Sequence, residues 1–216
     1  MSALPAQPVR TVYVVDDDDA VRDSLAMLFR AAGLDVEVFA SGAEFLQRGP
    51  YADTACLVLD IRMPGMTGMM LQNIIIEGGI HIPIIFVTGH GDIPMAVEAL
   101  KRGAYDFIEK PFDNDRLVSL VLGALESAGN RRRVEANRAV NAARLALLSG
   151  REREVLDHVL TGKPSRQIAA EMFISVKTVE FHRARIMQRL HVRSAAELFR
   201  VCLSGAPDRR DPSTER

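Results

Sequence analysis

Residues 55–65 read ACLVLDIRMPG, an apolar run that ends on Asp60 and continues into a loop with Pro64 and Gly65. Five consecutive apolar residues without alternation are typical of a strand that is covered on both faces of a sheet. Adjacent proline and glycine favour a tight loop, and we expect this loop to expose Asp60. The stretch therefore predicts a central strand whose carboxyl end presents a carboxylate.

Three further apolar runs stop on side chains that could hold a phosphoryl group: residues 12–15 before Asp16 and Asp17, residues 84–87 before Thr88, and residues 106–109 before Lys110. In an open parallel sheet, ligands bind outside the carboxyl ends of the strands, so these endings should meet in one crevice. Three carboxylates would repel one another there, and a hard cation such as Mg²⁺, together with the Lys110 ammonium, would compensate. The set predicts a divalent-metal site beside an aspartate that can carry phosphate.

The first half of the chain alternates strand and helix signals. Residues 36–39 add a fifth strand, and helix-length segments separate the strands: residues 20–32, 42–48, 68–77, 93–102 and 114–127. Asp18 and Asp19 are expected to cap the first helix at its positive end, and Gly33 to end it. The alternation predicts an α/β fold with a flavodoxin-like, five-stranded parallel sheet in the order 2-1-3-4-5.

Charge is distributed unevenly along the 216 residues. Residues 1–125 hold 17 Asp and Glu against 9 Lys and Arg, a net charge of −8, and residues 126–216 hold 11 against 18, a net charge of +7. Two modules with different partners are expected, and the basic one suits nucleic acid or anionic lipid. The sequence shows neither an 18-residue apolar run nor a secretory signal at its beginning, so we expect a cytoplasmic location, where Cys56 and Cys202 would be reduced, buried thiols.

The second half has helix signals and no strand signals from Leu145 onward. Ser149 and Glu152 have the spacing of a capping box that opens a helix, and further helices are expected after Ser165, Ser175 and Ser194. We expect an all-α, four-helix domain over residues 145–206. Residues 128–144 are read as a helical linker between it and a first domain over residues 1–127, and residues 207–216 as a disordered tail.

Residues 165–184 have the length and pattern of a helix-turn-helix. Val179, His182, Ile186 and Leu190 share one face of the second helix, where His182 is expected to be a core residue rather than a ligand. The remaining surface supplies the predicted DNA contacts: Lys177, Thr178, Glu180, Phe181, Arg185 and Gln188. Cationic side chains there could neutralise phosphates, Glu180 could accept from cytosine, and Phe181 could touch a thymine methyl group. A plain helical hairpin with a charged outer face is the alternative.

The first half resembles the receiver domain of bacterial response regulators over about residues 10–127. Four stretches carry the similarity: VVDDD at 14–18, LVLDIRMPG at 57–65, VTGHGD at 87–92 and FIEKPF at 107–112. The resemblance implies that Asp60 accepts a phosphoryl group from a sensor histidine kinase. It also implies that Thr88 and Lys110 contact the phosphoryl oxygens and that Phe107 is the switch aromatic.

The same resemblance implies a Mg²⁺ site. Asp17, Asp60 and the backbone carbonyl of Arg62 would bind the ion directly, and Asp16 would act through water.

The second half resembles the LuxR/NarL-type output domain. The similarity is carried by REREVL at 151–156, QIA at 167–169 and ISVKTVEFHR at 174–183. The whole chain thus resembles a FixJ-type regulator, close to StyR-type regulators of aromatic catabolism. The resemblance implies a transcription factor that forms a homodimer on phosphorylation, binds DNA and acts with RNA polymerase, and that catalyses only its own phosphorylation and slow dephosphorylation.

Two other functions fit parts of the sequence. A Mg²⁺-dependent phosphohydrolase with an aspartyl-phosphate intermediate would explain the crevice, but it would usually place a second carboxylate two residues after the nucleophile, where Arg62 stands. A DNA-binding protein with a silent receiver would explain the second half alone.

Overall fold

Five parallel strands form one sheet in the order β2-β1-β3-β4-β5, which is the predicted order. The computed structural model describes residues 10–89 and 93–205, so His90, Gly91 and Asp92 of the VTGHGD stretch and the expected tail at 207–216 lie outside the described residues. The strands are β1 (Arg10–Val15), β2 (Asp35–Phe39), β3 (Thr54–Asp60), β4 (Ile84–Thr88) and β5 (Asp106–Glu109). Every residue of β3 is buried, as its unbroken apolar run predicts.

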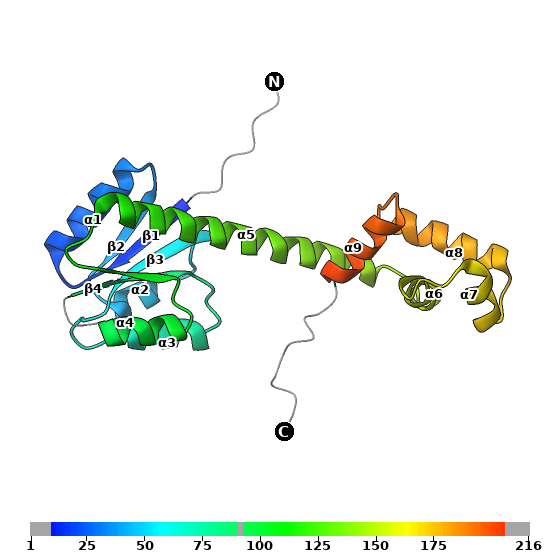
Figure 1. Ribbon diagram of the computed structural model, residues 1–216, viewed down its shortest axis with the longest axis horizontal. Coiled ribbons are helices and arrows are strands. Elements are labelled where there is room, and N and C mark those ends of the chain that lie inside the picture. Colours follow the sequence, from blue (N-terminus) through cyan, green and yellow to red (C-terminus); the bar gives the residue numbers. More distant parts are fainter. Residues whose placement is uncertain (1–9, 90–92, 206–216) are drawn as a thin grey trace, which may run out of the picture. The chain divides into compact units, whose positions relative to one another are not determined.

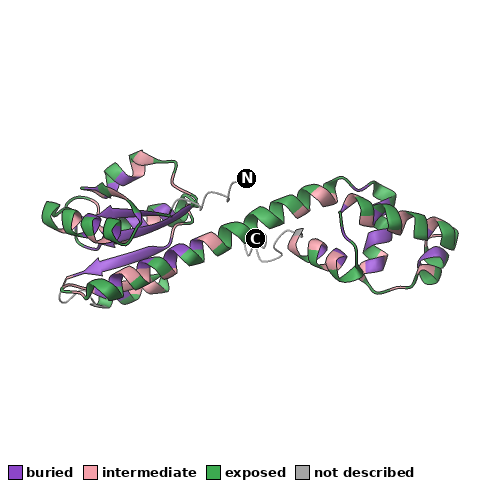
Figure 2. Cartoon of the chain, turned by 90° about the horizontal axis from the view of Figure 1, so that it is seen from above, coloured by how far each residue is buried: buried purple, intermediate pink, exposed green. Residues whose placement is uncertain are grey.

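Helices cover both faces of this sheet (Figure 1). They are α1 (Asp19–Ala31), α2 (Gly42–Arg48), α3 (Gly68–Glu77), α4 (Ile93–Lys101) and α5 (Asn114–Ala146). One core lies under α1 and α5 and includes Phe29 and Leu117; the other lies under α2, α3 and α4 and includes Phe45 and Leu71. Figure 2 shows the buried residues concentrated in the strands and on single sides of the helices.

The first helix begins and ends as expected. The Asp18 carboxylate accepts the backbone N–H groups of Ala20 and Val21, and Asp19 is the first helical residue. Gly33 follows the helix with a φ of +77°, a left-handed conformation that favours glycine.

The fifth helix joins two predicted segments. The helix expected at residues 114–127 and the helical linker expected at 128–144 form one helix, which runs for 33 residues to Ala146. The Arg-rich stretch at 131–133 does not interrupt it, because arginine and alanine are good helix formers and the segment holds no proline. Burial stops at Ala128, and the chain divides into two compact units between Arg132 and Arg133.

The second unit contains four further helices, α6 (Gly150–Leu160), α7 (Ser165–Glu171), α8 (Val176–Arg189) and α9 (Ala195–Gly205). The predicted capping box opens α6: the Ser149 hydroxyl accepts the N–H of Glu152, and the Glu152 carboxylate accepts the N–H of Ser149. Ser175 caps α8 in the expected position. Within residues 10–89 and 93–205, no helix combines the length and the apolar character needed to cross a membrane.

Candidate functional site

An acidic crevice lies at the carboxyl ends of β1, β3 and β5. Lys110, directly after β5, donates from Nζ to Asp16 Oδ2 at 2.9 Å and to Asp60 Oδ1 at 3.0 Å. Asp16 follows β1 and Asp60 ends β3, which pair in parallel. Two carboxylates that lie 94 and 50 positions before Lys110 in sequence are thereby held by its ammonium.

Asp60 is more enclosed than the sequence suggested. Gly65 has a φ of +73° and the predicted tight loop forms, but Asp60 is only 8% exposed. The loop folds back over it, and the N–H of Arg62 donates to Asp60 Oδ2 at 2.6 Å. The expectation that the loop exposes Asp60 is therefore wrong, because both carboxylate oxygens have protein partners.

A close backbone contact between the start of α3 and the end of β3 holds the loop after Asp60 closed. Gly68 N donates to the carbonyl of Ile61 at 3.0 Å. A Cβ at Gly68 would lie 2.3 Å from the carbonyl oxygen of Asp60, so only glycine allows this approach. The start of α3 thus determines where the end of β3 lies.

The electrostatics of the crevice follow from two carboxylates that share one ammonium. Burial raises the pKa of Asp60, and the hydrogen bond from Lys110 opposes this without cancelling it. Burial alone would lower the pKa of Lys110, but its hydrogen bonds to Asp16 and Asp60 outweigh burial and raise it. With Lys110 protonated and both carboxylates ionised, the trio carries a net negative charge that favours a further cation.

Thr88, at the end of β4, is fully buried, and its Oγ1 has no hydrogen-bond partner among the described residues. Its carbonyl accepts the N–H of Lys110 at 2.7 Å, which joins β4 to the segment after β5. Phe107 is half-buried and packs against the core under α2, α3 and α4. The structure thus leaves one buried hydroxyl beside the crevice with unused hydrogen-bonding capacity.

A metal ion fits the chemistry of the crevice. Asp16 and Asp60 offer buried carboxylate oxygens, the ligands that Mg²⁺ prefers, while the neighbouring Asp17 is exposed. In the side-chain arrangement of the described residues, no group of three His, Cys, Asp or Glu is gathered as a metal site. Lys110 bonds to both buried carboxylates instead, so a bound ion would share them with this ammonium.

The second candidate surface is the outward face of α8. Val179, Ile186 and Leu190 are buried, as predicted, and His182 is half-buried with Nδ1 lacking a partner among the described residues. Most predicted DNA contacts are exposed: Lys177, Glu180, Phe181, Arg185 and Gln188. Thr178 differs from them, because it is half-buried and its N–H and hydroxyl bond to the Ser175 hydroxyl at the helix cap.

Comparison with known proteins connects both halves of the chain to families. Residues 12–122 match the response regulator receiver domain, and residues 146–202 match the bacterial regulatory proteins of the luxR family. The transcriptional regulatory protein FixJ of Azorhizobium caulinodans is 42% identical over 203 residues, which cover 94% of this chain and 96% of that protein. The C4-dicarboxylate transport transcriptional regulatory protein DctR of Rhodobacter capsulatus is 42% identical over 193 residues, which cover 88% and 98%.

The chain belongs to the response-regulator family. Among solved structures, the response regulator StyR matches with a TM-score of 0.81 and 42% identity, covering 90% of this chain and 98% of that one. The resemblance to receiver and LuxR-type domains inferred from the sequence is confirmed. The chain is a transcriptional response regulator of the two-component type, and its relatives are regulators rather than hydrolases.

The sequence indicated Glu152 only as a helix-capping residue, and its contacts with α8 were not predicted. Glu152 is 2% exposed, and its carboxylate lies 3.0 Å from Arg189 Nη1 and 3.8 Å from Arg185 Nε. Burial would raise the pKa of Glu152, but the hydrogen bonds from Ser149 and the charges of both arginines lower it. The capping-box motif marked Glu152 in the sequence, but nothing there connected it to α8.

This network also organises the predicted DNA-binding face. The Arg185 guanidinium lies 5.5 Å from the centre of the Phe181 ring, so a cation–π contact joins two predicted contact residues. Arg189 donates to the carbonyl of Leu147 at 2.7 Å as well as pairing with Glu152. Glu152 therefore pairs with two arginines of α8, one of which, Arg185, is a predicted DNA contact.

Proposed function

We propose that Asp60 is the phosphoacceptor of this response regulator and that the donor is a phosphohistidine of a sensor histidine kinase. An Asp60 carboxylate oxygen attacks phosphorus, the new O–P bond forms as the P–N bond to the donor histidine breaks, and the electron pair leaves with the imidazole. The carrying observation is the convergence of Asp16, Asp60 and Lys110 at 2.9 and 3.0 Å beside a buried threonine hydroxyl without a partner.

Each neighbouring group has a role in this transfer. Lys110 neutralises charge on the phosphoryl oxygens, and the Thr88 hydroxyl turns to donate a hydrogen bond to one of them. Asp17, Asp60 and the backbone carbonyl of Arg62 would hold Mg²⁺, with Asp16 acting through water; when bound, the ion supplies further neutralisation of the transferred group. Phe107 then moves into the space that Thr88 leaves.

The consequence of phosphorylation is pairing of two copies and binding to DNA. We place the receiver in residues 1–127, a linker in 128–144 and the LuxR-type domain in 145–206. The unphosphorylated receiver masks the DNA-binding domain, and the surface around α4, β5 and the start of α5 pairs in the phosphorylated state. Two α8 helices then reach half-sites about one DNA turn apart, in the cytoplasm, where the complex acts with RNA polymerase.

Mass spectrometry of the full chain tests the assignment of Asp60. With acetyl phosphate and Mg²⁺, we expect an adduct of about 80 Da on the peptide that contains Asp60. Asp60→Asn should abolish it, and Asp35→Asn, an exposed carboxylate at the start of β2, should leave it unchanged. Full labelling of Asp60→Asn would exclude Asp60 as the acceptor.

A further inference from the structure

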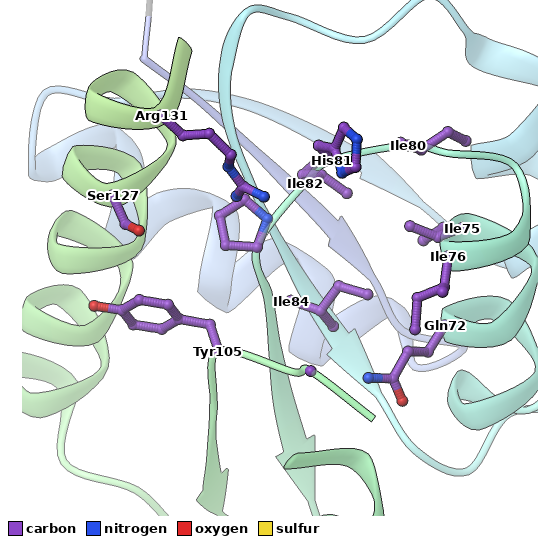
Figure 3. Close-up of a pocket in the computed structure, with 12 residues that line it drawn as sticks. Gln72, Ile75, Ile76, Ile80, His81, Ile82, Ile84, Tyr105, Ser127 and Arg131 are labelled. Carbon is purple, nitrogen blue, oxygen red and sulfur yellow. The ribbon is translucent and has the colours of Figure 1, made fainter. Parts of the chain in front are cut away.

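A cavity of about 220 Å³ lies at the amino ends of β4 and β5, the end of the sheet opposite to the acidic crevice. Ile84, the first residue of β4, and Tyr105, directly before β5, both line it, whereas the crevice lies at the carboxyl ends of the strands. Figure 3 shows Ser127 and Arg131 of α5 on one side of the cavity and Gln72 of α3 on the other. The cavity thus bridges helices from opposite faces of the sheet.

One wall of the cavity is aliphatic. Five isoleucines line it, Ile75, Ile76, Ile80, Ile82 and Ile84, with the exposed imidazole of His81 between Ile80 and Ile82. Ile75 and Ile84 are buried, but Ile76 is 51% exposed, so the apolar wall continues to solvent. Gln72 is fully buried below it and is held by a hydrogen bond from Nε2 to the carbonyl of Ala99 at 3.0 Å. A wall of this kind suits an apolar ligand body.

The opposite wall is polar and carries a positive charge. Arg131 is exposed, and no acidic side chain within the described parts of the chain forms an ion pair with it, whereas the next residue, Arg132, pairs with Asp53. The Tyr105 ring lies against α5 at Gly123, where a Cβ would be 2.8 Å from its hydroxyl oxygen, so the glycine leaves room for this ring. Arg131 and Ser127 therefore lie across the cavity from the isoleucine wall, while the Tyr105 hydroxyl points toward α5 and its ring lines the cavity (Figure 3).

We propose that this cavity binds a small organic acid with an aliphatic body. Its carboxylate pairs with Arg131, whose planar guanidinium matches carboxylate geometry, and its carbon chain lies on the isoleucines. A cavity of about 220 Å³ admits a small molecule rather than a drug-sized ligand. A single guanidinium beside an apolar wall favours a monocarboxylate over inorganic phosphate, which has no apolar body to bury.

Isoleucine methyl NMR of the full chain, titrated with hexanoate, tests the proposal. We expect saturable shifts of the Ile76, Ile80 and Ile84 methyl groups. Arg131→Ala should weaken hexanoate binding by about tenfold, because a charge-assisted pair is lost. Arg133→Ala, an exposed arginine on the same helix that does not line the cavity, should bind as the parent does.

Two further measurements separate the possible outcomes. Hexanamide, which has the same shape without the charge, should bind the parent about as weakly as hexanoate binds Arg131→Ala; equal binding of both compounds would refute carboxylate recognition.

Ser127→Phe should fill the cavity from an exposed helix position and abolish the shifts. Absence of saturable shifts in the folded parent would overturn the proposal. Asp60→Asn should bind hexanoate normally, so this site and the phosphoacceptor assignment are tested independently.

Discussion

Charge pairing at Lys110 and at Glu152 organises a group of side chains in each of the two units. In the first unit, Lys110 balances Asp16 and Asp60 only in part, and the remaining negative charge favours a cation, as the proposed phosphorylation of Asp60 requires. In the second unit, Glu152 is buried but fully paired, through Ser149, Arg185 and Arg189. The first arrangement is suited to reaction, because buried negative charge is balanced only in part, and the second to rigidity, because the buried carboxylate has a partner on every side.

Glu152→Ala should destabilise the second unit by about 2 kcal/mol, since the capping box and the arginine pairs are lost together. The lowered pKa of Glu152 means that its contribution is present above its unfolded-state pKa and disappears as pH falls through the lower folded-state pKa. Urea unfolding of the full chain, followed through NMR signals of α6 and α8, measures the loss at neutral and acid pH.

The control for that change is Glu154→Ala, which removes an exposed carboxylate paired only with Arg151. It should change the stability by less than about 0.5 kcal/mol. Equal effects of the two substitutions would show that Glu152 acts only as a surface charge.

At the scale of secondary-structure elements, the N-termini of α3 and α8 position the candidate functional groups. The start of α3 sits against the end of β3 because Gly68 has no side chain, and the Ser175 cap starts α8 so that its charged face is exposed. In both cases a local backbone requirement decides where a distant side chain points. The positions of Asp60 and of the α8 surface therefore depend on Gly68 and Ser175, which are not themselves predicted site residues.

Gly68→Ala should destabilise the first unit by about 2 kcal/mol and slow the labelling of Asp60, because the new methyl group forces the carbonyl of Asp60 away. Gly129→Ala is the matched control. Its Cβ would meet only Thr54 Cγ2, at an ordinary 3.9 Å, and alanine inside α5 should stabilise the helix by about 0.5 kcal/mol. Thermal unfolding and acetyl phosphate labelling, measured on both variants, check the contrast; normal labelling of Gly68→Ala would contradict it.

Lys177→Ala, in the first turn of α8, should weaken DNA binding across sequences and reduce the slope of log K against log[salt] by about one. Fluorescence anisotropy over a salt series measures this slope. Lys101→Ala, an exposed lysine at the end of α4, should leave it unchanged. An unaltered slope in Lys177→Ala would remove this lysine from the phosphate contacts.

At the scale of the whole molecule, an acidic receiver and a basic DNA-binding unit are joined by one continuous helix, α5, in which the two compact units divide. The opposite net charges suit different ligands, because a net negative half favours cations and a net positive half favours a polyanion such as DNA. If phosphorylation of the receiver is coupled to DNA binding, as proposed, the coupling free energy must change the affinity for DNA when the receiver binds a phosphoryl mimic.

Beryllium fluoride with Mg²⁺, which mimics the phosphoryl group, should therefore raise the affinity of the full chain for its upstream DNA by about tenfold or more. Footprinting and anisotropy, with and without the mimic, measure the change. Asp60→Asn should show no increase. Equal affinity of the parent protein in both conditions would support a DNA-binding protein whose receiver is silent.

The sequence by itself determined the strand endings at Asp16, Asp60, Thr88 and Lys110 and the caps at Asp18 and Ser149, because strand periodicity and capping chemistry are local. It also predicted the sheet order, because few arrangements of short alternating strands and helices satisfy the rules of connection. Only the tertiary structure decided that Asp60 is enclosed, that the predicted helix and the helical linker after it form one unbroken α5, and that Glu152 holds arginines of α8. These features arise where segments far apart in the chain meet in space. Burial and ion pairing there depend on three-dimensional distance, which sequence spacing does not report.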